Sequence, residues 1–144
     1  MSTHQPPPEG FGPTLNFGTF HDLTGPYYEM VLDERRAIVG MYVDDKHLNG
    51  HHNIHGGVYL TLADTAMTCA AVRHAIKYGD CVTTTLSSEL LAGAKKGEWI
   101  EADVEILKAG RRVVFLTCVV RRGRGGTEPL LRASATFIIK QRKA

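Results

Sequence analysis

Residues 100–106, IEADVEI, alternate strictly between apolar and acidic side chains. Apolar residues at every second position share one face of an extended chain, so the pattern predicts a half-buried β-strand within residues 98–110. Further runs rich in β-forming residues occupy 80–91, 111–123 and 130–140. Short Gly-bearing turns separate the last three strands, and such short links imply antiparallel pairing.

Two shorter β-rich runs, residues 28–33 and 37–43, come earlier and flank a polar turn. The longest helical candidate follows them, from about residue 57 to residue 78, and Gly79 is its expected end. Its apolar residues cover nearly every face, which is typical of a buried helix. Two strands, one buried helix and four further strands favour an α+β fold. In this fold a curved antiparallel sheet of about six strands wraps one long central helix.

Composition narrows the class of protein. The chain has 144 residues, of which 43% are apolar and 22% are charged, as in one globular domain. Its formal charge of +2 gives no reason to expect nucleic acid or a membrane as a partner. Three widely spaced cysteines fit small buried residues in a reducing compartment, so we expect a cytoplasmic protein.

The N-terminal region has a different character. It contains three consecutive prolines, and it has neither the basic start nor the apolar run of a signal peptide. We therefore expect residues 1–24 to be a flexible lead-in and residues 25–144 to form the domain.

The helical candidate opens on a His-Gly-Gly triplet within HHNIHGGVYLTLAD, residues 51–64. Glycines at a helix start let a ligand approach the backbone, and the first turn offers unpaired amides to an anion or a developing oxyanion. Asp64 is the only acidic residue between Asp45 and Asp80. An ionised carboxylate in an apolar helix costs several kcal/mol, so Asp64 is a candidate functional residue. On its own, a Gly-Gly pair before a helix is more often a plain loop end. A single aspartate in a helix is, on its own, more often a solvent-facing or capping side chain.

Together these features resemble a known family. The stretch HLNGHHNIHGGVYLTLADTA, residues 47–66, is similar to hotdog-fold acyl-CoA thioesterases of the phenylacetate-degradation (PaaI-like) and 4-hydroxybenzoyl-CoA types. The resemblance continues through the later strands and covers roughly residues 25–140. The residues that match the pattern are His47, Asn49, Ile54, His55, Gly56, Gly57 and Asp64.

The resemblance implies a role for each matching residue. The Gly56 amide would polarise the thioester carbonyl, and Asp64 would act either as the nucleophile or as the base that activates water. Thr83, early in the following strand, would help to position that water. Asn49, His55 and Gly57 would bind and orient the substrate. The reaction would turn acyl-CoA into a free acid and coenzyme A without a metal or a redox cofactor.

One position departs from the family pattern, because relatives commonly have glycine where this chain has His52. A histidine can adopt a positive φ, but at a cost in free energy. The sequence therefore does not determine the conformation of this loop.

The spacing of Gly56 and Asp64 also bears on assembly. Eight residues separate them, so on one helix they lie about 12 Å apart along the axis. A carbonyl about 3 Å from both groups is impossible within one chain. We therefore expect a homodimer with shared active sites, and the family suggests a homotetramer.

Other interpretations compete with this one. Four histidines, His47, His51, His52 and His55, could converge on a metal, although no cysteine lies near them and the thioesterase pattern already uses two. The turn with Arg121, Arg122 and Arg124 could hold coenzyme A phosphates or bind RNA, but a solvated hairpin tip is the simpler explanation.

Two other functions fit the same fold. A hydratase or dehydratase would need a histidine paired with a carboxylate, for which His55 and a partner chain's Asp64 are conceivable. A non-catalytic acyl-CoA sensor would bind the substrate and release nothing. The sequence favours the hydrolase over both.

Overall fold

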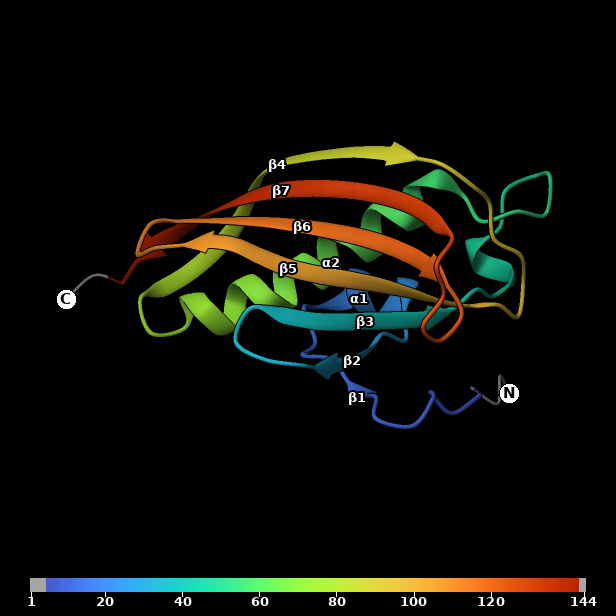
Figure 1. Cartoon of the computed structure of the whole chain (residues 1–144), viewed down its shortest axis with the longest axis horizontal. Helices are drawn as coiled ribbons and strands as arrows, with labels where there is room; N and C mark the ends of the chain where they lie inside the picture. Colours follow the sequence, from blue (N-terminus) through green and yellow to red (C-terminus); the bar gives the residue numbers. More distant parts are fainter. Residues whose placement is uncertain (1–4, 143–144) are drawn as a thin grey trace.

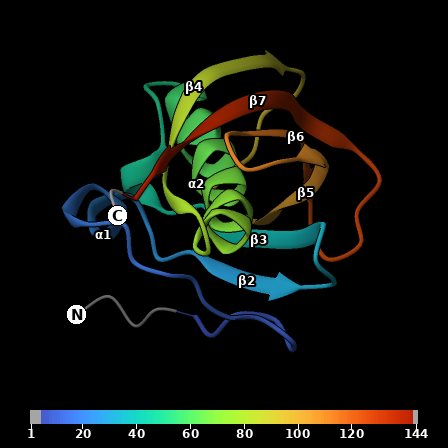
Figure 2. The same ribbon diagram turned by 90° about the vertical axis from the view of Figure 1, so that its left-hand side faces the viewer.

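Helix α2 (Gly56–Ala75) lies inside the curve of an antiparallel sheet in the computed structural model, which describes residues 5–142 (Figures 1 and 2). The strand order in the sheet is β1-β2-β3-β5-β6-β7-β4. The strands are β1 (Gly12–Pro13), β2 (Tyr28–Val31), β3 (Arg36–Tyr42), β4 (Gly79–Leu90), β5 (Trp99–Ala109), β6 (Val113–Arg122) and β7 (Pro129–Gln141). A short helix α1 (Thr19–Thr24) precedes β2, and a 3-10 turn η1 (Asp45–His47) follows β3.

The predicted α+β hotdog architecture is confirmed, with one strand more than expected. The sequence predicted about six strands, and the described residues form a sheet of seven. The additional strand β1 has only two residues, which pair with Glu29 and Tyr28 at the edge of the sheet. Two residues are too few to show a period, so the hydrophobic pattern could not reveal this strand.

The core lies between α2 and the concave face of the sheet. The predicted apolar face of β5 is buried there, with Ile100, Ala102 and Val104 fully inaccessible to solvent. Most residues that α2 buries are small, and five of them are alanines: Ala63, Ala66, Ala70, Ala71 and Ala75. Small side chains let the helix axis approach the strands closely, which suits a sheet that curves around it.

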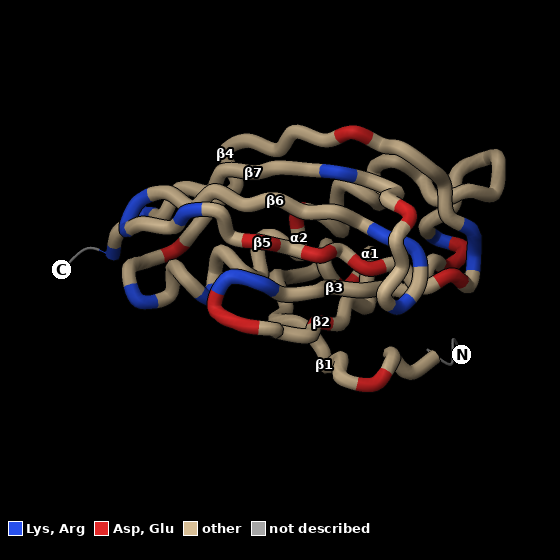
Figure 3. The backbone as a smooth tube through the Cα atoms, in the orientation of Figure 1, with Lys and Arg blue, Asp and Glu red and all other residues tan. Residues whose placement is uncertain are grey.

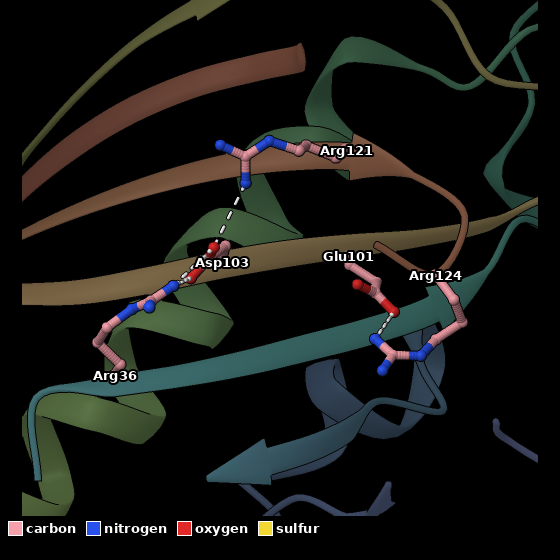
Figure 4. Close-up of polar contacts among 5 residues, drawn as sticks. All are labelled: Arg36, Glu101, Asp103, Arg121 and Arg124. Atoms are coloured by element: carbon pink, nitrogen blue, oxygen red, sulfur yellow. Dashed lines mark hydrogen bonds and ion pairs between the residues drawn. The ribbon is translucent and has the colours of Figure 1, made fainter. Parts of the chain in front are cut away.

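Charged residues on the convex face of the sheet are paired with one another (Figure 4). Asp103 accepts hydrogen bonds from Arg36 at 3.1 Å and from Arg121 at 3.4 Å. Glu101 is buried, and its Oε1 accepts from the Trp99 indole at 2.8 Å and from Arg124 at 2.5 Å. Over the whole backbone, basic and acidic residues are interspersed (Figure 3), in keeping with the small net charge.

The helix ends earlier than the sequence predicted, and Gly79 is not its end. The last helical residue is Ala75, and the Ile76 amide donates to the Val72 carbonyl at 2.9 Å. Gly79 instead begins β4, beside β7. A Cβ at Gly79 would lie 1.9 Å from the Lys140 carbonyl oxygen, so glycine is needed for close backbone approach and not for a helix cap.

Residues 5–24, which we expected to belong to a flexible lead-in, contain β1 and α1; residues 1–4 lie outside the described part. Several contacts attach this segment to the domain. The Phe11 ring meets Trp99 edge-on at 5.2 Å, and the Arg124 guanidinium lies 5.0 Å from the same Phe11 ring. The Tyr42 hydroxyl donates to the Pro6 carbonyl at 3.1 Å. The domain boundary at residue 25 stays a prediction.

All three cysteines are free thiols, and Cys69 and Cys118 are buried in the core. Burial raises the pKa of each of these two thiols to about 12, so both stay protonated and behave as small apolar groups. Within residues 5–142, no helix is both long and apolar enough to cross a membrane.

We predict that Gly79→Ala destabilises the fold. The added methyl group would meet backbone atoms of β7, which cannot turn aside as a side chain can, so the free energy of unfolding should fall by about 1–3 kcal/mol. Gly12→Ala is the matched control, because nothing lies within 4 Å of the corresponding Cβ. Urea unfolding of both variants measures the effect, and equal midpoints for the two would contradict the close-approach explanation.

Candidate functional site

The loop before α2 is shaped first by His47, which is buried. Its Nδ1 accepts from the Asp44 amide at 2.9 Å, and its Nε2 therefore carries the proton and donates to the Thr24 carbonyl at 2.6 Å. Burial lowers the pKa of the His47 imidazole, which keeps the ring neutral. His47 thus links the loop to the C-terminal end of α1.

Asn49 holds the next turn of the loop together. Its side-chain oxygen accepts from the backbone amides of His51 at 2.9 Å and Asn53 at 3.2 Å. Between these two residues His52 has φ 61°, in the left-handed region, which answers the question that the sequence had left open about this loop. A local hydrogen-bonded turn of this kind helps a non-glycine residue to hold such a conformation.

Helix α2 begins with its first amide free of protein partners. The His55 side chain caps the helix, because its Nδ1 accepts from the Gly57 amide at 2.9 Å. Among residues 5–142 the Gly56 amide donates to no acceptor. The amides of Gly57 and Val58 both donate to His55, whereas the Gly56 amide can polarise a ligand.

Asp64 lies in the middle of α2, on the side that faces β4. Its Oδ1 accepts a hydrogen bond from the Thr83 hydroxyl at 2.8 Å. Thr83 also lies where β4 departs from its regular register with β7, since the pairing shifts between Thr83 and Thr85. The sequence named Asp64 as a catalytic candidate, and the family resemblance implied that Thr83 helps to position water. The fold brings their side chains together, and their roles stay predictions.

Asp64 and Thr83 line a cavity of about 490 Å³ between α2, β4 and the N-terminal segment. Leu60 and Leu86 contribute from α2 and β4. Sequence reasoning missed the remaining wall, which comes from residues 17–21. A signal was present, because Phe17, Phe20 and Leu23 recur every third residue, but the prolines upstream drew the whole region into the expected lead-in.

The candidate residues form two groups in one chain. Asp64 and Thr83 line the cavity, whereas Asn49, His55, Gly56 and Gly57 do not. The second group gathers at the start of α2, about 12 Å from Asp64 along the helix axis. One chain thus presents a carboxylate at one place and a free helix-start amide at another.

The structure also places the four histidines and the basic turn, which the sequence offered as alternative binding sites. In the part of the chain that the structure describes, no three His, Cys, Asp or Glu residues are grouped so as to hold a metal ion. Each arginine of the turn pairs with a carboxylate. Arg121 pairs with Asp103 and Arg124 with Glu101 (Figure 4). Arg122 pairs with Glu98 and Glu128. A phosphate at this turn would have to compete with these carboxylates.

Comparison with known proteins gives a consistent family and fold. The model of the family described as the thioesterase superfamily matches residues 51–128. The protein named "Putative esterase PA0474" of Pseudomonas aeruginosa is 30% identical over 116 residues, which are 81% of this chain and 87% of that protein.

Solved structures share the fold at lower identity. The PaaI protein of the Escherichia coli phenylacetic acid degradation operon superposes with a TM-score of 0.73 at 21% identity, covering 84% of this chain and 83% of that one. A hypothetical thioesterase of Streptococcus pneumoniae, solved with coenzyme A, gives a TM-score of 0.71 at 20% identity, with 82% and 88% covered.

We predict that His47 makes stability depend on pH. Because the folded state lowers the pKa of His47, the unfolded chain takes up a proton first as the pH falls below about 6.5. The free energy of unfolding should therefore fall from that pH downward and level off below the folded-state pKa. His47→Gln can accept from Asp44 and donate to Thr24 without titrating, so its unfolding should depend less on pH. Urea midpoints between pH 8 and pH 5 measure this, and identical slopes for both proteins would exclude His47 as the cause.

Proposed function

The chain belongs to the thioesterase superfamily, and from this premise we propose that it hydrolyses an acyl-CoA thioester to a free acid and coenzyme A. The coenzyme A bound to the streptococcal thioesterase of similar fold supports this class of substrate. We assign the catalytic residues to the domain of residues 25–144, and we assign the reaction to the cytoplasm, where the free thiols of the chain would stay reduced.

The observation that carries the proposal is the hydrogen bond between Asp64 and Thr83 at 2.8 Å inside the cavity. The Thr83 hydroxyl donates to Asp64, so its oxygen lone pairs remain available to accept a proton of a water molecule. In one route Asp64 takes a proton from that water, which attacks the thioester carbonyl carbon. In the other route the Asp64 carboxylate attacks directly, and water then hydrolyses the resulting anhydride. In both routes the C–S bond breaks and coenzyme A leaves as the thiolate, which is then protonated.

The Gly56 amide is proposed to stabilise the negative charge that develops on the carbonyl oxygen. A backbone donor at a helix start suits this task, because its dipole is already oriented and the helix end adds positive potential. His55 and Gly57 lie next to this donor at the start of α2. Together with Asn49 of the preceding loop they would orient the carbonyl, the His55 ring through its Nε2–H.

We propose that each active site takes Gly56 from one chain and Asp64 from another. The support is the separation of about 12 Å along α2, which no side-chain rotation closes. A homodimer related by a two-fold axis would form two equivalent sites of this kind, and pairing of such dimers would give the expected tetramer.

The first test removes the carboxylate. Asp64→Asn keeps the size of the side chain but can act neither as a base nor as an anionic nucleophile, so kcat should fall by about 10²–10⁴-fold while acyl-CoA still binds. Thr83→Ala should be milder, losing about 5–30-fold, and Thr83→Ser should resemble the wild type. Thiol release from a panel of acyl-CoAs measures these rates. Full turnover by Asp64→Asn would remove Asp64 from the mechanism, and acyl-CoA binding by the wild type without thiol release would favour a sensor.

The second test mixes two inactive variants. Gly56→Pro deletes the amide donor at a helix position where proline is otherwise tolerated, and Asp64→Asn removes the carboxylate. A mixed dimer would contain one doubly damaged site and one intact site. With random exchange about half the dimers are mixed, so activity should return to roughly a quarter of the wild-type value.

Gly56→Ala is the matched control for this experiment. It keeps the amide but adds the same Cβ, which would lie 2.9 Å from Leu90 Cδ2, so it separates the loss of the donor from crowding. A tagged pull-down confirms subunit exchange beforehand. If exchange occurs and activity does not return, both groups act from the same chain and the shared site is wrong.

A further inference from the structure

Helix α1 leaves its apolar side chains unpacked within the chain. None of its residues is buried. Phe20 is 64% exposed and Leu23 is 70% exposed, and Phe17 just before the helix is 40% exposed. Aromatic rings this accessible next to a cavity with a candidate catalytic carboxylate suggest contact with a ligand.

Polar contacts within this segment shape its start, and polar contacts with the domain attach its end. At its start the Asn16 side chain accepts from the Gly18 amide at 2.7 Å and donates to Asp22 at 2.6 Å. At its end the Thr24 carbonyl accepts from buried His47, and the Gly25 carbonyl accepts from Lys46 at 2.5 Å. The rings of residues 17 and 20 are therefore held against the cavity by contacts that do not involve the rings themselves.

Edge-on contacts between aromatic rings orient this wall further. The His21 ring meets Phe17 at 5.7 Å and Tyr27 at 5.0 Å, both edge-on, and Tyr27 is part of the buried core. The chain of rings from Tyr27 through His21 to Phe17 thus connects the cavity wall to the core.

The opposite wall of the cavity contains three threonines of α2, Thr61, Thr65 and Thr68, and the hydroxyls of two of them bind the helix backbone. The Thr61 hydroxyl donates to the Gly57 carbonyl at 2.9 Å, and the Thr68 hydroxyl donates to the Asp64 carbonyl at 2.6 Å. Since both hydroxyls are engaged with the helix backbone, these residues contribute mainly their methyl groups to the cavity. Asp64 and Thr83 form a hydrogen-bonded polar pair in a space whose other lining residues are leucines, phenylalanines, threonines and His21.

We propose that Phe17 and Phe20 form the far wall of the acyl pocket and determine which acyl groups the enzyme accepts. This inference rests on the proposed thioesterase activity. The acyl group fits this wall better than the pantetheine arm of coenzyme A does, because the arm carries two amides that would need hydrogen-bond partners. The substrate class is therefore an apolar acyl group, chain or ring, that extends from the carbonyl at Asp64 as far as α1.

The test compares acyl groups of different reach. Acetyl-, butanoyl-, hexanoyl- and phenylacetyl-CoA are assayed with the wild type, and kcat/KM for each is divided by that for the shortest acyl group hydrolysed. In Phe20→Ala this ratio should fall by about tenfold for the acyl groups that reach the wall, because the truncated side chain no longer covers them. Phe20→Trp should shift the preference toward shorter acyl groups. A larger fall of the ratio for hexanoyl-CoA would indicate a pocket for an alkyl chain. A larger fall for phenylacetyl-CoA would indicate a pocket for an aromatic ring.

Leu23→Ala is the matched control, since Leu23 is exposed on the same helix but does not line the cavity. Its ratios should equal those of the wild type. Light scattering on every variant tests whether α1 instead contacts a second subunit. Unchanged ratios in both Phe20 variants overturn the proposal, and so does a change of oligomeric state in Phe20→Ala without a change of ratio. A wild type that hydrolyses none of the panel would instead refute the proposed function itself.

Discussion

The packing of α2 against the concave face of the sheet is the interaction on which the other features depend. Ala63, Ala66 and Ala70 let the helix approach closely, and β5 meets it with a fully buried face. A helix packed in this way cannot slide or rotate without opening voids in the core. Its first turn and its midpoint are therefore held as two fixed places on the surface of the domain.

Those two fixed places explain why one chain supplies only half of each site that we propose. The Gly56 amide and the Asp64 carboxylate belong to the same rigid helix, so no loop motion can bring them together. In the site that we propose, the second half comes from another copy of α2. In this view the reaction requires assembly of two chains. The helix that stabilises the fold also keeps Gly56 and Asp64 too far apart to act on one carbonyl within a chain.

The sequence predicted those parts of the fold that have a regular pattern. Alternation identified β5, and the apolar run identified a buried α2, because both depend on which side chains the core must bury. The His-Gly-Gly triplet and Asp64 were found from their chemistry. Thr83 came from the family resemblance, and its hydrogen bond to Asp64 is a geometric agreement that no pattern could supply.

Features that depend on contacts between distant segments were not predictable. Gly79 looked like a helix end, but its neighbour is the carbonyl of Lys140, sixty-one residues away in sequence. The sequence favoured a solvated hairpin tip for the basic turn, but it could not show that Arg121 and Arg124 pair with carboxylates on another strand. The wall of the cavity formed by Phe17 and Phe20 was missed for the same reason, since only the fold shows where residues 17–21 meet Asp64.

The contact between Phe11 and Trp99 has a consequence for spectroscopy. Trp99 is the single tryptophan of the chain, and its ring lies under the N-terminal segment with its N–H bonded to the buried Glu101 carboxylate. Detachment of that segment would expose the indole to water while the sheet around it stayed intact. The intrinsic fluorescence of the protein therefore reports on the attachment of residues 5–24. Trp99 is thus an intrinsic fluorescence probe of the segment that also carries the proposed wall of the acyl pocket.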